Sequence, residues 1–235
     1  MSISTFEKTC ISPYLGIVSY ERALELQRQL MEARAQGGIG DVLLLLEHPP
    51  VFTVGRFRGE DDMTVPPEAV TRERIAVFHT NRGGGITFHG PGQLVGYPIL
   101  NLKEHNLGLC EYVGKLEATI INLLLALGIQ GRTAAEYPGV WVGERKVCSI
   151  GIHVSHHITT HGFALNVSND LQYFKHVRPC GLSGEVMTSV SELLGHRVDI
   201  ETVIGKLLPS FSETFGLGCE QESDEWLAIL DARSG

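Results

Sequence analysis

Apolar residues recur at helical spacing in two segments, which predicts one helix from Ser19 to about Ala35 and another within residues 107–128. Ser19 is a suitable N-cap for the first of these helices. Asp199 is a suitable N-cap for a third helix, which we expect Pro209 to kink or divide. The two apolar stripes consist of Ala23, Leu24, Leu26, Leu30 and Met31, and of Leu116, Ile120, Leu123, Leu124 and Leu127.

Other segments have the pattern of β-strands, with apolar runs or alternation bounded by glycine and proline. Residues 56–73 are polar, contain Pro66-Pro67, and are typical of a long loop. Strands and helices follow one another without a repeat, which predicts an α/β (α+β) fold with a mixed β-sheet core flanked by helices. The expected strands are 42–46, 86–88, 93–98 and 160–167, and residues 140–142 and 146–153 are expected to pair as a hairpin.

The composition is that of an ordinary globular protein, because 43% of the 235 residues are hydrophobic and 20% are charged. We expect one domain, residues 1–235, with a helical C-terminal portion at about 198–235 packed on it. The net charge of −8 argues against nucleic acid as the main partner. The apolar runs are too short to cross a bilayer, so no membrane partner is expected.

The cysteines and the N-terminal residues indicate a compartment. Five cysteines are scattered along the chain without a CxxC pair, which fits reduced thiols better than disulfides or a zinc site. The first residues have no basic stretch followed by an apolar block, so no secretory signal is expected. Together these features predict a cytoplasmic protein.

Arg82 to Gln93 is the first segment whose residues suit a functional site. Glycine lets the backbone approach a ligand closely, and Arg82, Thr87, His89 and Gln93 could point into a pocket. The spacing matches neither a phosphate-binding loop nor a dinucleotide fingerprint. A tight turn without a ligand remains the alternative.

Lys146 begins a second candidate segment. Strand alternation would place it on one face with Cys148, Ile150 and Ile152. A lysine on an otherwise apolar face is costly unless it has a partner or lies at an edge. The alternative is a lysine at a strand end whose ammonium extends to water.

Cys180 lies between Pro179 and Gly181, and therefore in a loop. Loops on a rigid scaffold often hold catalytic groups, and a neighbouring cation would increase the thiolate fraction of this thiol. An inert thiol is the alternative.

Four histidines, at positions 153, 156, 157 and 161, lie close enough in sequence to suggest a metal site. Metal sites usually recruit carboxylate or cysteine ligands as well. The tract is more typical of two strands and their connecting turn, so we expect no metal site.

Five long segments occur in an order that resembles the lipoyl(octanoyl) transferases, also called the lipoate-protein ligase B family. The resemblance extends from about Gly40 to Gly195. The chain departs mildly from the family pattern at two positions, with Gly85 where glutamine is expected and Phe88 where tyrosine is usual, and each change is expected to remove a polar group near the pocket. The matching segments are RGGGITFHGPGQLVGYPILNL, GVWVGERKVCSIGIHV, HGFALNVSNDL, HVRPCGL and TSVSELLG.

The resemblance implies the fold of the biotin and lipoate protein ligases. It implies transfer of an octanoyl (or lipoyl) group from an acyl carrier protein thioester to a lysine of a lipoyl domain, through a thioester on Cys180. Lys146 would lower the pKa of that cysteine. The residues that the resemblance assigns to acyl binding are Arg82, Gly83, Gly84, Gly85, Ile86, Thr87, Phe88, His89, Ser149, Ile150, Gly151, Gly162, Phe163 and Ala164.

The implied partners are octanoyl-acyl carrier protein as donor, and the lipoyl domains of 2-oxoacid dehydrogenase E2 subunits and the glycine cleavage H protein as acceptors. No cofactor is expected, since an amide is more stable than a thioester and transfer needs no ATP. Three other functions stay open: an ATP-dependent lipoate ligase, a cysteine thioesterase (hydrolase), and a catalytically silent binding module. A carrier protein is acidic, so docking cations are expected near Cys180, at Arg145, Lys175, His176 and Arg178. The alternative is that these are ordinary solvated surface charges.

Overall fold

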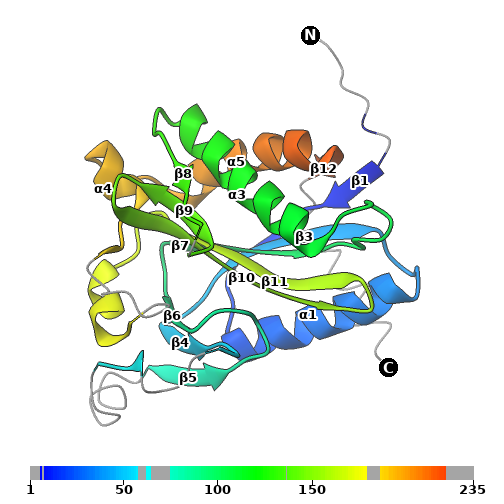
Figure 1. The fold of residues 1–235 in the computed structure, drawn as a ribbon, viewed down its shortest axis with the longest axis horizontal. Helices are drawn as coiled ribbons and strands as arrows, with labels where there is room; N and C mark the ends of the chain where they lie inside the picture. The colour runs from blue at the N-terminus through cyan, green and yellow to red at the C-terminus, as the bar shows by residue number, and fades with distance from the viewer. Residues whose placement is uncertain are drawn as a thin grey trace.

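The computed structural model describes residues 6, 8–57, 62–64, 75–135, 137–178 and 186–220 (Figure 1). Cys180, which the sequence points to as the nucleophile, lies outside the described residues. The elements are β1 (Lys8–Ile11), β2 (Tyr14–Ile17), α1 (Tyr20–Ala35), β3 (Asp41–Glu47), β4 (Val51–Val54), β5 (Ala76–His79), β6 (Ile86–His89), β7 (Gln93–Ile99), α3 (Leu109–Ala126), β8 (Arg132–Thr133), β9 (Gly139–Val142), β10 (Arg145–Ser155), β11 (Ile158–Asn166), the 3₁₀ helix η2 (Leu171–His176), α4 (Val190–Leu194), α5 (Ile200–Phe215) and β12 (Leu217–Glu220).

Within the described residues nine strands form one mixed sheet, as predicted. Its order is β12-β1-β3-β7-β11-β10-β9-β8, and β2 pairs with β3 beside that path. Along the path β3-β7-β11-β10-β9-β8 every pair of neighbouring strands is antiparallel, while β1 is parallel to both β12 and β3. The longest pair is β10 and β11, a hairpin that lies next to the central strand β7.

Helices bury both faces of this sheet (Figure 1). Leu43 and Leu45 of β3 pack into the core that α3 and α5 cover. Leu44 and Leu46 of the same strand pack into a second core beneath α1. A strand buried on both faces has a continuous apolar sequence rather than an alternating one, which is why residues 42–46 were recognisable.

A smaller sheet, in the order β5-β4-β6, lies on the α1 side of the large sheet (Figure 1). Its own core contains Phe52, Phe88 and Phe174. The strands on either side of the turn at residues 90–92 therefore belong to different sheets, because β6 pairs with β4 while β7 pairs with β3. The chain crosses between the sheets at this turn.

The predicted helix starts are confirmed, since Ser19 accepts from the N–H of Arg22 and Asp199 from the N–H of Thr202. The prediction that Pro209 could divide the third helix is wrong, because α5 continues through this residue to Phe215. The expected loop at residues 56–73 lies largely outside the described residues.

Of the helices described, none is both long and apolar enough to cross a membrane.

Candidate active site

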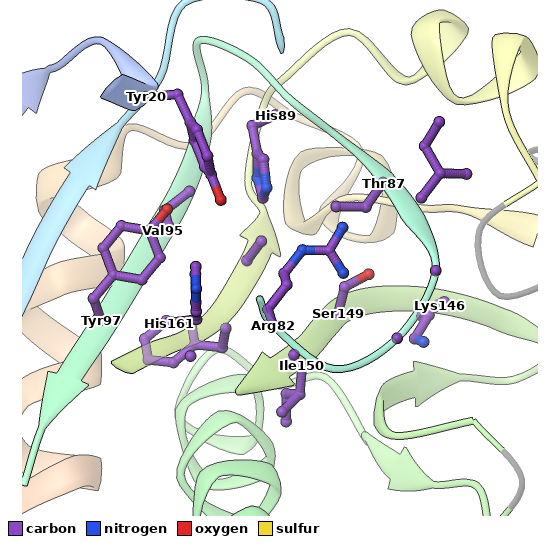
Figure 2. Close-up of a pocket in the computed structure, with 17 residues that line it drawn as sticks. Tyr20, Arg82, Thr87, His89, Val95, Tyr97, Lys146, Ser149, Ile150 and His161 are labelled. Carbon is purple, nitrogen blue, oxygen red and sulfur yellow. The ribbon is translucent and has the colours of Figure 1, made fainter. Parts of the chain in front are cut away.

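One cavity of about 560 Å³, counted with its open mouth, lies between the large sheet and the glycine-rich segment that precedes β6. Figure 2 shows Lys146 toward one end, Tyr97 and His161 toward the other, and Arg82 between them. The cavity is lined by Tyr20, Arg82, Gly84, Gly85, Ile86, Thr87, His89, Val95, Tyr97, Lys146, Ser149, Ile150, Gly151, His161, Gly162, Phe163 and Ala164.

A β-bulge in β10 points Lys146 into this cavity. Lys146 pairs with Trp141, but the next paired residue, Cys148, already faces Val140, so β10 holds one extra residue there. Val147 and Cys148 both pack into the core beneath α3. The expectation that Lys146 shares a face with Cys148 is therefore wrong, because an extra residue inverts the alternation. Lys146 is 3% exposed and lies on the cavity side.

The backbone of Lys146 is tied to the segment that leads away from Cys180. Its carbonyl accepts from the N–H of Thr188 at 2.9 Å, and Lys146 forms an isolated parallel bridge with Met187. On the other side of Cys180, the N–H of Arg178 donates to the carbonyl of Asp62 at 2.7 Å. Both flanks of the undescribed segment 179–185 are thus fixed by backbone hydrogen bonds.

Arg82 enters the cavity from the glycine-rich segment and is anchored on Thr53 of β4. Its Nη2 donates to the carbonyl and to the hydroxyl of Thr53 at 2.6 and 2.8 Å, and its Nε donates to that hydroxyl at 3.2 Å. Nη1 donates to the carbonyl of Gly83 at 3.0 Å. A guanidinium that is only 8% exposed is thereby held at the cavity wall.

A chain of buried side chains continues from Thr53 to the Lys146 backbone. His89 Nε2 lies 3.3 Å from the Thr53 hydroxyl, and His89 Nδ1 lies 2.7 Å from Gln93 Oε1. Gln93 Nε2 donates to Asn166 Oδ1 at 2.9 Å. Asn166 Nδ2 donates to the carbonyl of Thr188 at 3.0 Å.

The direction of these bonds fixes the state of His89. Because Gln93 Oε1 is an acceptor, the His89 proton lies on Nδ1, and Nε2 accepts from Thr53. Burial, with His48 and Arg82 nearby, holds the pKa of His89 well below its usual value. His89 is therefore a neutral part of the wall, which orients Arg82 through Thr53.

The end of the cavity far from Lys146 is made of aromatic and imidazole rings that carry no charge at neutral pH. Burial lowers the pKa of His161 to about 3 and raises that of Tyr20 to about 12. The polar atoms of these rings have protein partners: Tyr97 OH lies 2.8 Å from His48 Nε2, and His161 Nε2 lies 2.7 Å from Asn81 Oδ1. Such an end suits an acyl chain better than a charged ligand.

Of the residues assigned to acyl binding, Gly83 and Phe88 do not line the cavity. The N–H of Gly83 donates to the carbonyl of Ile152 at 2.9 Å and fixes the glycine-rich segment against β10. The ring of Phe88 stacks on Tyr173 at 4.7 Å, inside the core of the small sheet. The departure from tyrosine at position 88 therefore removes no polar group from the cavity wall.

Sequence reasoning did not assign Tyr20, Val95, Tyr97 or His161 to the cavity. Val95 and Tyr97 alternate along β7 with residues of the opposite face, so the period of the strand contained a signal for them. Tyr20 comes from the first turn of α1. Its place in the cavity depends on how that helix crosses the sheet, which no local pattern records.

The histidine tract forms the two strands and turn that were predicted. His153 lies in β10, His161 in β11, and His156-His157 make the turn between them with positive φ angles. No group of three or more histidine, cysteine, aspartate or glutamate residues in the described part of the chain could hold a metal ion.

The cations expected near Cys180 differ in their surroundings. Lys175 and Arg178 are exposed. Arg145 instead forms an ion pair with Glu192 at 3.3 Å, in which both side chains are about half exposed.

Comparison with known proteins identifies the family. Residues 19–212 match the lipoyl protein ligase A/B catalytic domain. The chain belongs to this family. An octanoyltransferase of Solibacter usitatus (strain Ellin6076) is 45% identical over 208 residues, which is 88% of this chain and 94% of the relative. An octanoyltransferase of Alkaliphilus metalliredigens (strain QYMF) is 43% identical over 86% of this chain and 93% of the relative. The resemblance to lipoyl(octanoyl) transferases is confirmed.

Solved structures confirm the predicted fold of this lipoyl protein ligase A/B family member. Lipoate-protein ligase A bound with ATP superposes with a TM-score of 0.74 at 17% identity, over 96% of this chain and 93% of that one. A bipartite lipoate protein ligase from Thermoplasma acidophilum superposes with the same TM-score at 16% identity, over 96% and 92%. At such low identity the likeness establishes the fold and leaves the reaction to the site and the closer relatives.

Proposed function

We propose that this chain transfers an octanoyl (or lipoyl) group to the lysine of a lipoyl domain through a thioester on Cys180, with Lys146 as its partner. The curated relatives are octanoyltransferases, so the chain is an acyltransferase of that kind. The observation that supports the dyad is the buried Lys146 side chain at the cavity, on a backbone bonded to the segment that leaves Cys180.

In the first half-reaction the ammonium of Lys146 favours the thiolate of Cys180, as an opposite charge does for any acid. The thiolate attacks the carbonyl of the donor thioester, and a new carbon–sulfur bond forms as the bond to the carrier's sulfur breaks. Lys146 gives its proton to the departing carrier thiolate. The enzyme is left acylated, with Lys146 as a neutral amine.

In the second half-reaction the amine of the target lysine attacks the thioester on Cys180. Its ordinary pKa is near 10.4, so the ammonium must first lose one proton to solvent to become a nucleophile. The neutral Lys146 accepts the second proton of that nitrogen as the amide forms and Cys180 leaves as a thiolate. This returns the starting pair of ammonium and thiolate, and neither step needs ATP.

The cavity would hold the acyl chain with its carbonyl toward Lys146 and its tail toward Tyr97 and His161 (Figure 2). Burying seven or so methylene and methyl groups is favourable by about 5–6 kcal/mol. Among the described residues none forms a hydrogen bond with the buried Thr87 hydroxyl at this wall, so we expect that hydroxyl to bond a polar atom of the acyl group.

The proposed donor is octanoyl-acyl carrier protein. The proposed acceptors are the lipoyl domains of 2-oxoacid dehydrogenase E2 subunits and the glycine cleavage H protein. The Thermoplasma ligase of the same fold is described with its E2 lipoyl domain, which supports this class of acceptor.

A two-stage transfer tests the proposal. The enzyme is acylated with octanoyl-acyl carrier protein, separated from donor, and mixed with an apo lipoyl domain in the absence of ATP. We expect octanoyl-lysine to form. An ATP-dependent ligase would give no product until ATP was added, and a hydrolase would release free octanoate instead.

A further inference from the structure

Trp141 of β9 lies directly across the strand pair from Lys146. The Lys146 Nζ atom is 5.5 Å from the centre of the Trp141 ring. Both side chains are buried, with 3% of Lys146 and 6% of Trp141 exposed. An ammonium within about 6 Å of a tryptophan face is attracted by the ring, and more strongly where water is excluded.

The Trp141 ring is itself held in place. Its indole N–H donates to the carbonyl of Tyr137 at 3.4 Å, and the two rings pack with centroids 6.3 Å apart. These two contacts restrict the orientation in which the ring meets the lysine.

Gly139 leaves room for the lysine chain. A side chain there would begin 2.8 Å from Lys146 Cε and 2.3 Å from the carbonyl oxygen of Cys148. Its φ of +128° is also a conformation that favours glycine. Three features therefore determine where the Lys146 side chain lies: the space left at Gly139, the ring of Trp141, and the bulge after Lys146.

We propose that Trp141 is a positioning residue for Lys146, which keeps its ammonium charged and directed into the cavity before the donor arrives. This rests on the proposed role of Lys146 toward Cys180. A ring face stabilises the ammonium and not the neutral amine, so Trp141 favours the state that supports the Cys180 thiolate. The contact is released when Lys146 gives up its proton and returns when the proton does.

The test compares Trp141→Leu with Trp141→Phe. The rate at which iodoacetamide alkylates Cys180 is followed against pH, with the site resolved by peptide mass spectrometry. Site resolution is needed because the exposed Cys110 can also react, and a hydrogen bond from Cys10 lowers the pKa of Cys219 to about 7. Trp141→Leu should slow Cys180 alkylation at pH 7 by about 2- to 30-fold and move its profile to higher pH. Trp141→Phe, which keeps a ring, should lie between this variant and the wild type.

The chain offers a matched control. Lys115 Nζ also lies 5.5 Å from a ring centre, that of Phe215, on the α3 and α5 side of the sheet. Phe215→Leu removes a buried ring and an equal contact, and should lower the unfolding temperature without moving the Cys180 profile. If Trp141→Leu does not fold, Trp141→Phe provides the test, and its profile should be shifted in the same direction by a smaller amount.

Three outcomes decide whether Trp141 positions Lys146. A Trp141→Leu profile (or, if that variant does not fold, a Trp141→Phe profile) that coincides with the wild type, while Lys146→Met is shifted, would overturn the positioning role and leave the proposed function standing. A Lys146→Met profile that is itself unshifted would overturn both. Shifts in the Trp141 variants and in Lys146→Met, with none in Phe215→Leu, are the expected result.

Discussion

The backbone N–H of Thr188 donates to the carbonyl of Lys146 at 2.9 Å. Thr188 is eight positions after Cys180 in the sequence (188 − 180), and Lys146 is thirty-four before it (180 − 146). The strand that presents the lysine and the segment that returns from the cysteine are thus joined by a direct bond. The series of side-chain hydrogen bonds that runs from Thr53 to Asn166 ends on the carbonyl of the same Thr188. The cavity wall and the Thr188–Lys146 backbone bond therefore belong to one hydrogen-bond network.

Replacing Cys180 should abolish transfer, because the proposed route passes through its thioester. Cys180→Ala should give no acyl-enzyme and no octanoyl-lysine in a transfer assay. Cys148→Ala is the matched control, since Cys148 is fully buried and burial raises the pKa of its thiol to about 12. That variant should keep most of its activity, and its complete loss would count against the assignment.

Thr53→Val should damage the cavity without touching the proposed dyad. Valine has the shape of threonine but leaves Arg82 Nε and His89 Nε2 without the hydroxyl between them. A buried polar group without its partner costs about 1–3 kcal/mol of unfolding free energy. We expect that loss in urea denaturation, together with a higher KM for the acyl donor.

Thr53→Ser, which keeps the hydroxyl, is the control for Thr53→Val. It should restore the KM to near the wild-type value. An equal rise in KM for serine and valine would mean that the hydroxyl does not orient Arg82.

The fold should lose stability in mild acid through buried histidines. Burial lowers the pKa of His48 to about 4, below the ordinary value near 6.5 that it regains on unfolding. The stability that neutral His48 contributes is therefore complete above about pH 6.5 and is lost as the pH falls toward 4. Each pH unit in that window costs about 1.4 kcal/mol for one histidine.

His48→Gln should reduce the slope of unfolding free energy against pH in this window by up to that amount, as measured by urea denaturation at several pH values. A His48→Gln slope equal to the wild type would show that His48 does not titrate on unfolding.

Charge reversal at Lys175 and Arg178 should weaken use of the carrier-protein donor. Both side chains are exposed just before Cys180, and the protein as a whole has a net charge of −8. Lys175→Glu with Arg178→Glu should raise the KM for octanoyl-acyl carrier protein, and salt should reduce the difference. Octanoyl-CoA, which needs less protein docking, should be affected much less.

Lys103→Glu with Lys206→Glu makes the same change in net charge at other exposed cations and serves as the control. It should leave the KM for the carrier protein nearly unchanged. Equal losses with carrier protein and octanoyl-CoA in the Lys175 and Arg178 variant would indicate a damaged site rather than a docking patch.

Much of the fold follows from local patterns in the sequence. Helical spacing of apolar residues and the flanking residues predict α1 and α3, and the continuous apolar run predicts β3. The four-residue strands β1, β2 and β12 were not foreseen, because their pairing depends on parallel neighbours distant in sequence. The continuation of α5 past Pro209 was missed as well, since tertiary packing on α3 outweighs one lost hydrogen bond.

Most of the residues that line the cavity were named through the family resemblance, and alternation alone gave a wrong orientation for Lys146. A period of two assumes a regular ladder, whereas the bulge before Cys148 is visible only in the pairing with β9. Tyr20 was missed for a similar reason, because it reaches the cavity through the crossing of α1 over the sheet, which involves residues far apart in the chain. Tyr97 was missed although the alternation along β7 contained a signal for it.

The most direct test of the central claim is an intact-mass spectrum of the protein after brief incubation with octanoyl-acyl carrier protein. The account predicts one octanoyl adduct, located on Cys180 by peptide mapping and removed by hydroxylamine as a thioester is. It also predicts much slower adduct formation at pH 7 in Lys146→Met, where the cation beside the thiol is lost. An adduct on another residue, or one that forms at the wild-type rate in Cys180→Ala, would contradict it.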